Sequence, residues 1–278
     1  MVVRPLSSPT LRVTPANRPA PVQVVPRKPA TSWDQPIAPR PQDISAVIAR
    51  LHTIRDELAK KQDVRVVWAT TYLLQTENTL KALQGPNDYE NPEFIRQLST
   101  RFAQYFFDAY DAYERGDMAH VSEPWKRVFD LAKDKNELTM ETLLLSIDVH
   151  INYDLPRALA DINAQPGANQ RDFERYNQLF QDGMTAAKDK IITSYSRKLG
   201  PINLLSLGDK LLFWLDTPLA IKWIGFIRGR AWDRAMALEQ GDQTTFPAMR
   251  KNTLGYIQNV EFVSRNPIHR FLARERVF

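Results

Sequence analysis

A short polar segment of the chain, His150-Ile-Asn-Tyr-Asp-Leu-Pro156, holds side chains that could do acid–base chemistry. The run before it, residues 139–149, is apolar enough to be a buried helix. His150 and Asp154 are four residues apart, so a helix places both on one face. Burying an imidazole and a carboxylate costs roughly a few kcal/mol unless each finds a hydrogen-bond partner. The pair is therefore either a satisfied structural network or a functional site.

Two interpretations of this segment follow from its residue types. In the functional one, Asp154 orients the imidazole and raises its basicity, and His150 is a general base or a metal ligand. Asn152 points to a different face of an ideal helix, and it joins the site only if Pro156 distorts the turn. In the structural one, the same polar groups bond backbone atoms at a kink made by Pro156, which should kink or end the helix.

Further polar residues within apolar segments are weaker candidates. Asp108 lies among aromatic residues and is expected to point inward. Asp172 and Asn177 could form another polar site, although Asp172 could simply cap a helix. Arg101 and Arg230 could be buried counter-ions for the acids, or could lie at the surface.

Metal and cofactor motifs are nearly absent from the sequence. The histidines are His52, His120, His150 and His269, with neither an H-E-x-x-H nor a paired E-x-x-H motif. This pattern excludes a helical di-iron bundle. A site with one histidine and several carboxylates remains open, so the metal and the cofactor stay unknown. The chain has no cysteine, no P-loop, and no G-x-S-x-G or G-x-G-x-x-G motif.

The positive charge is confined to one end of the chain. Residues 1–41 carry six Lys or Arg and one acid, whereas the rest carries 31 basic and 31 acidic residues. A folded part without basic excess cannot neutralise phosphates, so nucleic acid is not an expected partner. No apolar run reaches the length of a transmembrane helix, and the amino terminus lacks a secretory signal. The absence of cysteine suits a reducing compartment, and we expect a cytoplasmic protein.

Proline separates an arm from a helical domain. Ten of the nineteen prolines lie in residues 1–41, where they favour extended, solvated backbone. We expect residues 1–42 to be a disordered arm that tethers the domain or, through its P-x-x-P spacings, recruits a protein partner.

Residues 43–278 show helical periodicity nearly everywhere. Some expected helices have a clear start, at residues 43, 122 and 139. Others span 64–83, 92–115, 171–198, 203–215, 217–240 and 246–264, and one more follows residue 267. The predicted fold is an all-α, single multi-helix bundle.

The segments above resemble a known family of uncharacterised bacterial helical proteins, catalogued only as a domain of unknown function. Its hallmark is N-A-H-I-N-x-D-L-P-x-A-L, which runs here from Asp148 to Leu159. A second segment, R-F-A-x-x-Y-F-D-A, is matched from Arg101 to Ala109. Weaker matches follow at Trp125 with Phe129 and at 172–177. The resemblance covers residues from about 43 to the carboxyl end.

The resemblance implies which positions belong together, but it implies no reaction. It singles out the set Arg101, Asp108, His150, Asn152 and Asp154. The sequence departs from the pattern at Asp148, where asparagine is usual. This change could alter the hydrogen-bond partner of the imidazole.

The leading hypothesis is an enzyme that acts on a small, largely apolar metabolite in a polar pocket inside the bundle. His150 and Asp154 would be catalytic, and Asn152, Asp108 and Arg101 would bind the substrate. The alternative is a non-catalytic ligand-binding or protein-interaction module, in which the His/Asn/Asp network is structural. A third hypothesis is a membrane-surface role through residues 211–223.

Overall fold

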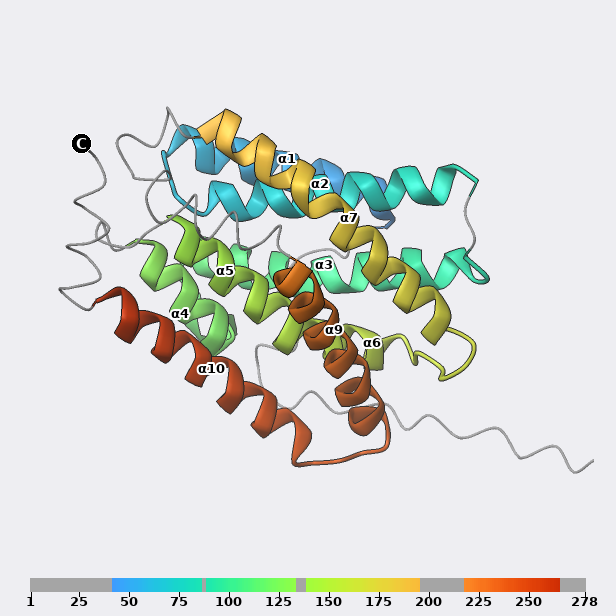
Figure 1. The fold of residues 1–278 in the computed structure, drawn as a ribbon. Coiled ribbons are helices and arrows are strands. Elements are labelled where there is room, and N and C mark those ends of the chain that lie inside the picture. Colours follow the sequence, from blue (N-terminus) through green and yellow to red (C-terminus); the bar gives the residue numbers. More distant parts are fainter. Residues whose placement is uncertain (1–41, 87–88, 134–138, 196–217, 266–278) are drawn as a thin grey trace, which may run out of the picture.

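The computed structural model describes residues 42–86, 89–133, 139–195 and 218–265, which fold into helices without any strand (Figure 1). This confirms the all-α class. The helices are α1 (Ile44–Lys60), α2 (Val66–Gln84), α3 (Pro92–Glu114), α4 (Glu123–Ala132), α5 (Thr139–Val149), α6 (Leu155–Asp161), α7 (Gln170–Tyr195), α9 (Pro218–Glu239) and α10 (Thr245–Ser264). The arm up to residue 41, the helices expected at 203–215 and after 267, and residues 211–217 of the membrane hypothesis lie outside the described residues.

Local signals set where the first helices begin. The Asp43 carboxylate caps α1 by accepting the Ala46 backbone N–H at 2.8 Å. The Asn91 side chain caps α3 by accepting the Phe94 N–H at 3.2 Å, and Pro92 follows in the first turn. Each side-chain oxygen satisfies a backbone donor that the first turn leaves unpaired.

The helix does not end at Pro156: the chain passes through one π-helical turn, His150–Asp154, between α5 and α6. In this turn the Leu155 N–H bonds the His150 carbonyl, five residues back. Pro156 has no N–H to give to the Asn152 carbonyl, which accepts a hydrogen bond from Arg234 of α9 at 3.2 Å instead. The substitute donor explains why the helix continues.

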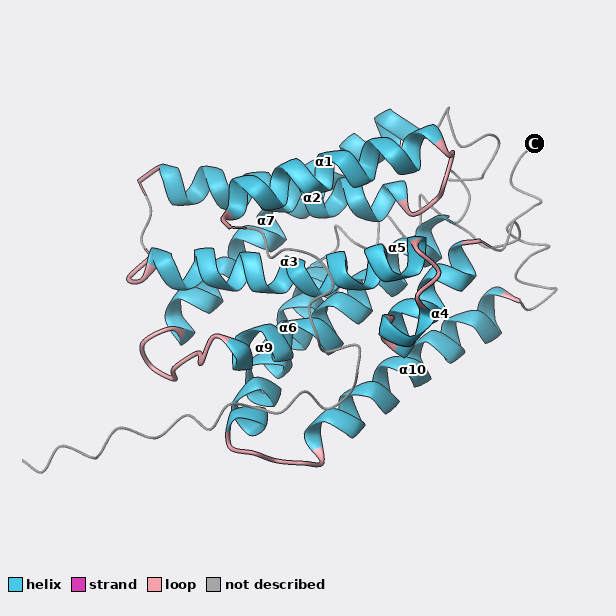
Figure 2. Cartoon of the chain, turned by 180° about the vertical axis from the view of Figure 1, so that it is seen from behind, coloured by secondary structure: helices cyan, strands magenta, loops and turns pink. Residues whose placement is uncertain are grey.

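The segment α5–π turn–α6 lies in the middle of the bundle, where helices from several sides reach it. Helices α1 and α2 lie side by side along one edge, and α10 lies along the opposite edge (Figure 1). Seen from behind, α3 crosses the back of the bundle (Figure 2). Helices α2, α3, α4, α9 and α10 all contact α5, the π turn or both. Any polar side chain of the π turn that points inward therefore meets the packed core.

Candidate functional site

His150 lies in a compartment of aromatic rings and is only 2% exposed. The Phe102 ring stacks on the imidazole with the ring centroids 3.6 Å apart. Tyr72 and Trp68 meet the imidazole edge-on, at 4.7 and 5.3 Å between centroids. The imidazole therefore has aromatic rings on several sides.

Asp154 holds the other side of the imidazole. One carboxylate oxygen lies 3.0 Å from His150 Nδ1 and also accepts the indole N–H of Trp125 at 2.7 Å. The second oxygen pairs with the Arg157 guanidinium at 3.5 Å. A carboxylate with these donors acts as an acceptor, so Nδ1 carries the proton and Nε2 the lone pair. No described residue offers His150 Nε2 a hydrogen bond.

The imidazole is held in its neutral form. Burial lowers the pKa of His150 because it removes the water that would solvate the cation, and Asp154 only partly opposes this effect. The positive charge of Arg228 lowers this pKa further. The site is thus a neutral imidazole with an oriented, unused lone pair.

Asn152 belongs to a neighbouring cluster and not to the imidazole itself. Its side-chain N–H donates to Asp148 at 2.8 Å, and its side-chain oxygen accepts from Arg234 at 2.9 Å. Asp148 is buried, and burial raises the pKa of its carboxyl group to about 7, against the opposing effects of Asn152 and Arg234. One Asp148 oxygen, Oδ2, has no hydrogen-bond partner among the described residues.

Arg101 is linked to the site only indirectly. It donates to Asp161 at 2.6 Å and to the Tyr105 hydroxyl at 3.1 Å. The Arg157 guanidinium lies over the Tyr105 ring, 3.9 Å from the ring centroid. Arg157 in turn pairs with Asp154, so Arg101 reaches the His150–Asp154 pair only through Tyr105 and Arg157.

The other sequence candidates have separate contacts. Asp108 is buried and accepts from Gln104 at 2.6 Å, one turn earlier on α3. Asp172 accepts the backbone N–H groups of Glu90 and Asn91 at 2.8 and 2.6 Å, and so fastens α7 to the start of α3. Asn177 accepts from Arg228 of α9.

Three polar side chains near the His150–Asp154 pair were not among the sequence candidates: Arg157, Trp125 and Arg228. Arg157 lies three residues after Asp154, a spacing that does signal a helical ion pair. Trp125 is 29 residues from Asp154 in the sequence, and only the packing of α4 brings it there. Arg228 is buried, whereas Arg230, the arginine that the sequence suggested, is exposed.

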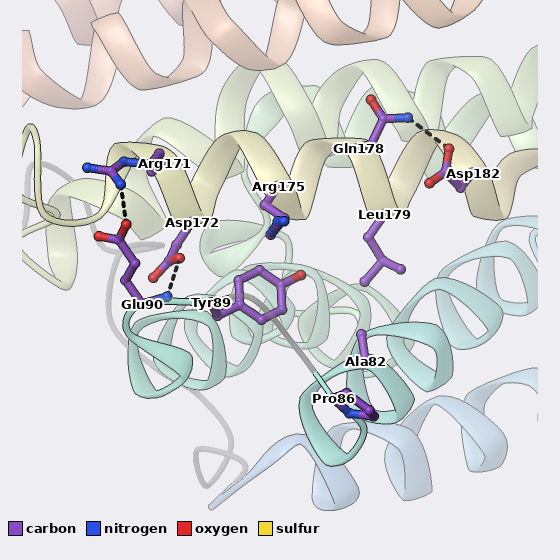
Figure 3. A pocket seen from close by; sticks show the side chains of 10 residues that line it. All are labelled: Ala82, Pro86, Tyr89, Glu90, Arg171, Asp172, Arg175, Gln178, Leu179 and Asp182. Atoms are coloured by element: carbon purple, nitrogen blue, oxygen red, sulfur yellow. Dashed lines mark hydrogen bonds and ion pairs between the residues drawn. The ribbon is translucent and has the colours of Figure 1, made fainter.

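A separate cavity of about 550 Å³ opens beside α7 (Figure 3). Its walls come from the end of α2, the segment before α3 and α7, and include Tyr89, Asp172, Arg175 and Leu179. None of the five site residues expected from the sequence lines this cavity. A hollow directly beside His150 stays a prediction.

Comparison with known proteins decides the family. Residues 44–261 match the model of a family of unknown function (DUF5995). The chain belongs to this family. No curated protein and no solved structure matches the chain. Membership of DUF5995 agrees with the resemblance of the sequence segments and supplies no reaction.

Two structural tests bear on the hypotheses. Within the described residues, no three His, Asp or Glu side chains gather in a way that could hold a metal ion. The helices of the described part do not include one that is long and apolar enough to cross a membrane.

Proposed function

We propose that the protein is an enzyme that acts on a small, largely apolar molecule, with neutral His150 as general base and Asp154 as the residue that orients it. The observation that carries this proposal is the buried Nε2 lone pair, which no described residue uses. A general base needs a deprotonated nitrogen that points in a fixed direction. The hydrogen bond from Nδ1 to Asp154 keeps the proton on Nδ1, so Nε2 is deprotonated, and it fixes the orientation of the ring.

The cost of an unpaired buried nitrogen favours a functional site over a purely structural position. Leaving a buried acceptor without a hydrogen bond costs about 1–3 kcal/mol. Most buried polar atoms avoid this cost, and the exceptions often mark functional positions. Asp154, in the same network, has Trp125 and the neighbouring imidazole as donors, so only the outer nitrogen of the pair is left for a substrate.

The rings around Nε2 define which molecules fit. The rings of Phe102, Tyr72 and Trp68 surround the imidazole, so the substrate body is apolar and its reacting proton points to Nε2. Because Nε2 is sealed from solvent, a ring moves aside before the substrate enters. Arg101, Asp108 and Asn152 remain proposed substrate-binding residues, with the contacts described above.

The alternative is a non-catalytic ligand-binding or interaction module with a structural His150 network. The close stacking of Phe102 on the imidazole, at 3.6 Å between centroids, favours it. The cytoplasmic location and a protein partner for the proline-rich arm also stay proposals, based on the absence of cysteine and on the P-x-x-P spacings.

Replacing His150 with glutamine tests the proposal against this alternative. Glutamine can still donate to Asp154 but offers no basic nitrogen. A panel of small apolar esters and ketones is incubated with the protein in D2O, and proton NMR follows hydrolysis and exchange at carbons next to the carbonyl. We expect turnover by the native protein and a loss of at least about 100-fold in His150→Gln.

The matched control is His120→Gln, since His120 is a more exposed histidine that bonds Asp117. We expect it to keep full turnover. No turnover by the native protein, or equal turnover in His150→Gln, would contradict the catalytic proposal. A stability loss above about 2 kcal/mol in His150→Gln without any change in turnover would establish the structural alternative.

A further inference from the structure

Arg228 of α9 is a buried cation whose hydrogen bonding is incomplete. It is 1% exposed. Its Nε donates to the Asn177 side-chain oxygen of α7, but one terminal nitrogen, Nη2, has no partner among the described residues. Three aromatic rings of α7 flank the guanidinium at 5.0 to 5.7 Å, those of Phe173, Tyr176 and Phe180.

The contrast with the other buried arginines is informative. Arg65 is paired with Asp63 and Glu114, and Arg157 is paired with Asp154. No ion pair joins Arg228 to an acid of the described chain, although it is as deeply buried. Burial lowers the pKa of Arg228 to about 10, so the side chain is still charged at neutral pH. A buried, unpaired charge is costly unless an anion joins it.

Arg228 faces the same interior as His150. Helix α9, which carries Arg228, contacts the π turn that carries His150, and α7, whose rings flank the guanidinium, contacts α2, which carries Tyr72. The positive charge of Arg228 contributes to the lowered pKa of His150. Tyr72 touches the imidazole, with the ring centroids 4.7 Å apart. The unpaired cation and the unused lone pair therefore border one aromatic region between α2, α7 and α9.

The cavity beside α7 lies next to this region. Tyr89 and Arg175 line the cavity, and Tyr176 follows Arg175 in α7. Tyr176 also packs against the Arg228 guanidinium. Figure 3 shows Tyr89 in the cavity beneath α7. Arg228 thus packs against the same helix, α7, that forms one wall of the cavity.

We propose that the ligand of this site is a small monocarboxylate with an apolar body, whose carboxylate binds the free guanidinium edge of Arg228. This inference rests on the proposed function. Asn177 fixes Nε, so the guanidinium presents its unused N–H groups in a set direction. A single cation among aromatic rings matches one negative charge and an apolar remainder better than a doubly charged phosphate. The apolar body then extends over Tyr72 toward His150.

Calorimetric titration with matched acids and alcohols tests the proposal. The probes are hexanoate and benzoate, compared with hexan-1-ol and benzyl alcohol. We expect the two acids to bind the native protein more tightly than the alcohols. The variant Arg228→Met, which removes the charge but keeps the length, should bind the acids at least about tenfold more weakly. The control Arg230→Met, on the same helix and exposed, should leave acid binding unchanged.

Two further readouts separate the outcomes. Without ligand, Arg228→Met should unfold at a higher temperature than the native protein, because an unpaired buried charge is gone; a lower temperature would show that Arg228 is structural and overturn the carboxylate site. If Arg228→Met does not fold, Arg228→Lys takes its place and should bind the acids more weakly than the native protein does. Unchanged acid binding by Arg228→Lys would overturn the carboxylate site.

The carboxylate inference and the proposed function fail differently. Acids that bind no better than alcohols would overturn the carboxylate inference, while turnover that depends on His150 would still support the catalytic proposal. If none of the four probes binds the native protein and the ester and ketone panel is not turned over, both proposals are wrong.

Discussion

Asp154→Ala should lower the free energy of unfolding by about 3–5 kcal/mol, the largest loss that we expect for any residue of the site. The change removes the acceptor for the Trp125 indole N–H and for His150 Nδ1, and it removes a carboxylate from Arg157. Each donor is buried, so water cannot replace the lost oxygen. Urea unfolding followed by circular dichroism measures the change.

Asp154→Asn is the matched control, because it keeps the shape and one acceptor oxygen. It should cost less, about 1–3 kcal/mol, since Trp125 can still donate to the amide oxygen. An Asp154→Ala protein within about 1 kcal/mol of the native one would show that the network contributes little to the fold.

Asp148→Asn should stabilise the protein, and the gain should grow with pH. The pKa of Asp148 is raised by burial from 3.8 to about 7 in the folded protein. The folded state thus holds the proton more tightly than the unfolded chain, so the contribution of Asp148 is fully present below pH 3.8 and is lost as pH rises toward 7. Asparagine does not titrate and still accepts from Asn152.

The expected gain at about pH 8 is roughly 2–4 kcal/mol, and near pH 4 it should almost vanish. Asp148 also interacts with two other ionisable groups. The charge of Arg234 on α9 lowers the pKa of Asp148, and Asp148 raises the pKa of Tyr256 on α10. Urea unfolding at both pH values measures the gain. The exposed Asp182→Asn should change stability by less than about 0.5 kcal/mol at either pH. A gain that is equal at both pH values would refute the raised pKa.

Most helices could be predicted from the sequence because their signals are local. The expected helix at 92–115 is found as Pro92–Glu114, where Asn91 and Pro92 mark its start. The outcome at Pro156 was not predictable in detail. Helix continuation there depends on Arg234, 82 residues from Asn152, which replaces the missing donor. Such long-range compensation leaves no trace in the local pattern.

The candidate site could be predicted only along its own helix. The contact of His150 with Asp154 follows from their spacing of four residues. Trp125 depends on helix packing, which spacing cannot reveal. For another reason, Arg228 was not named as a candidate. Apolar residues are spread around α9, so the sequence does not show which arginine points inward.

The ionisation state of His150 is the claim on which the catalytic proposal depends, and nitrogen-15 NMR of the imidazole measures it directly. The His150 signals are assigned by their absence from His150→Gln. Between about pH 7 and 9 we predict a protonated Nδ1 and an unprotonated Nε2, because the pKa of His150 lies below its ordinary value of 6.5. Burial keeps the pKa of His150 low, and Asp154 keeps the proton on Nδ1. A proton on Nε2 anywhere in this range, as the other tautomer or as the imidazolium, would contradict the account.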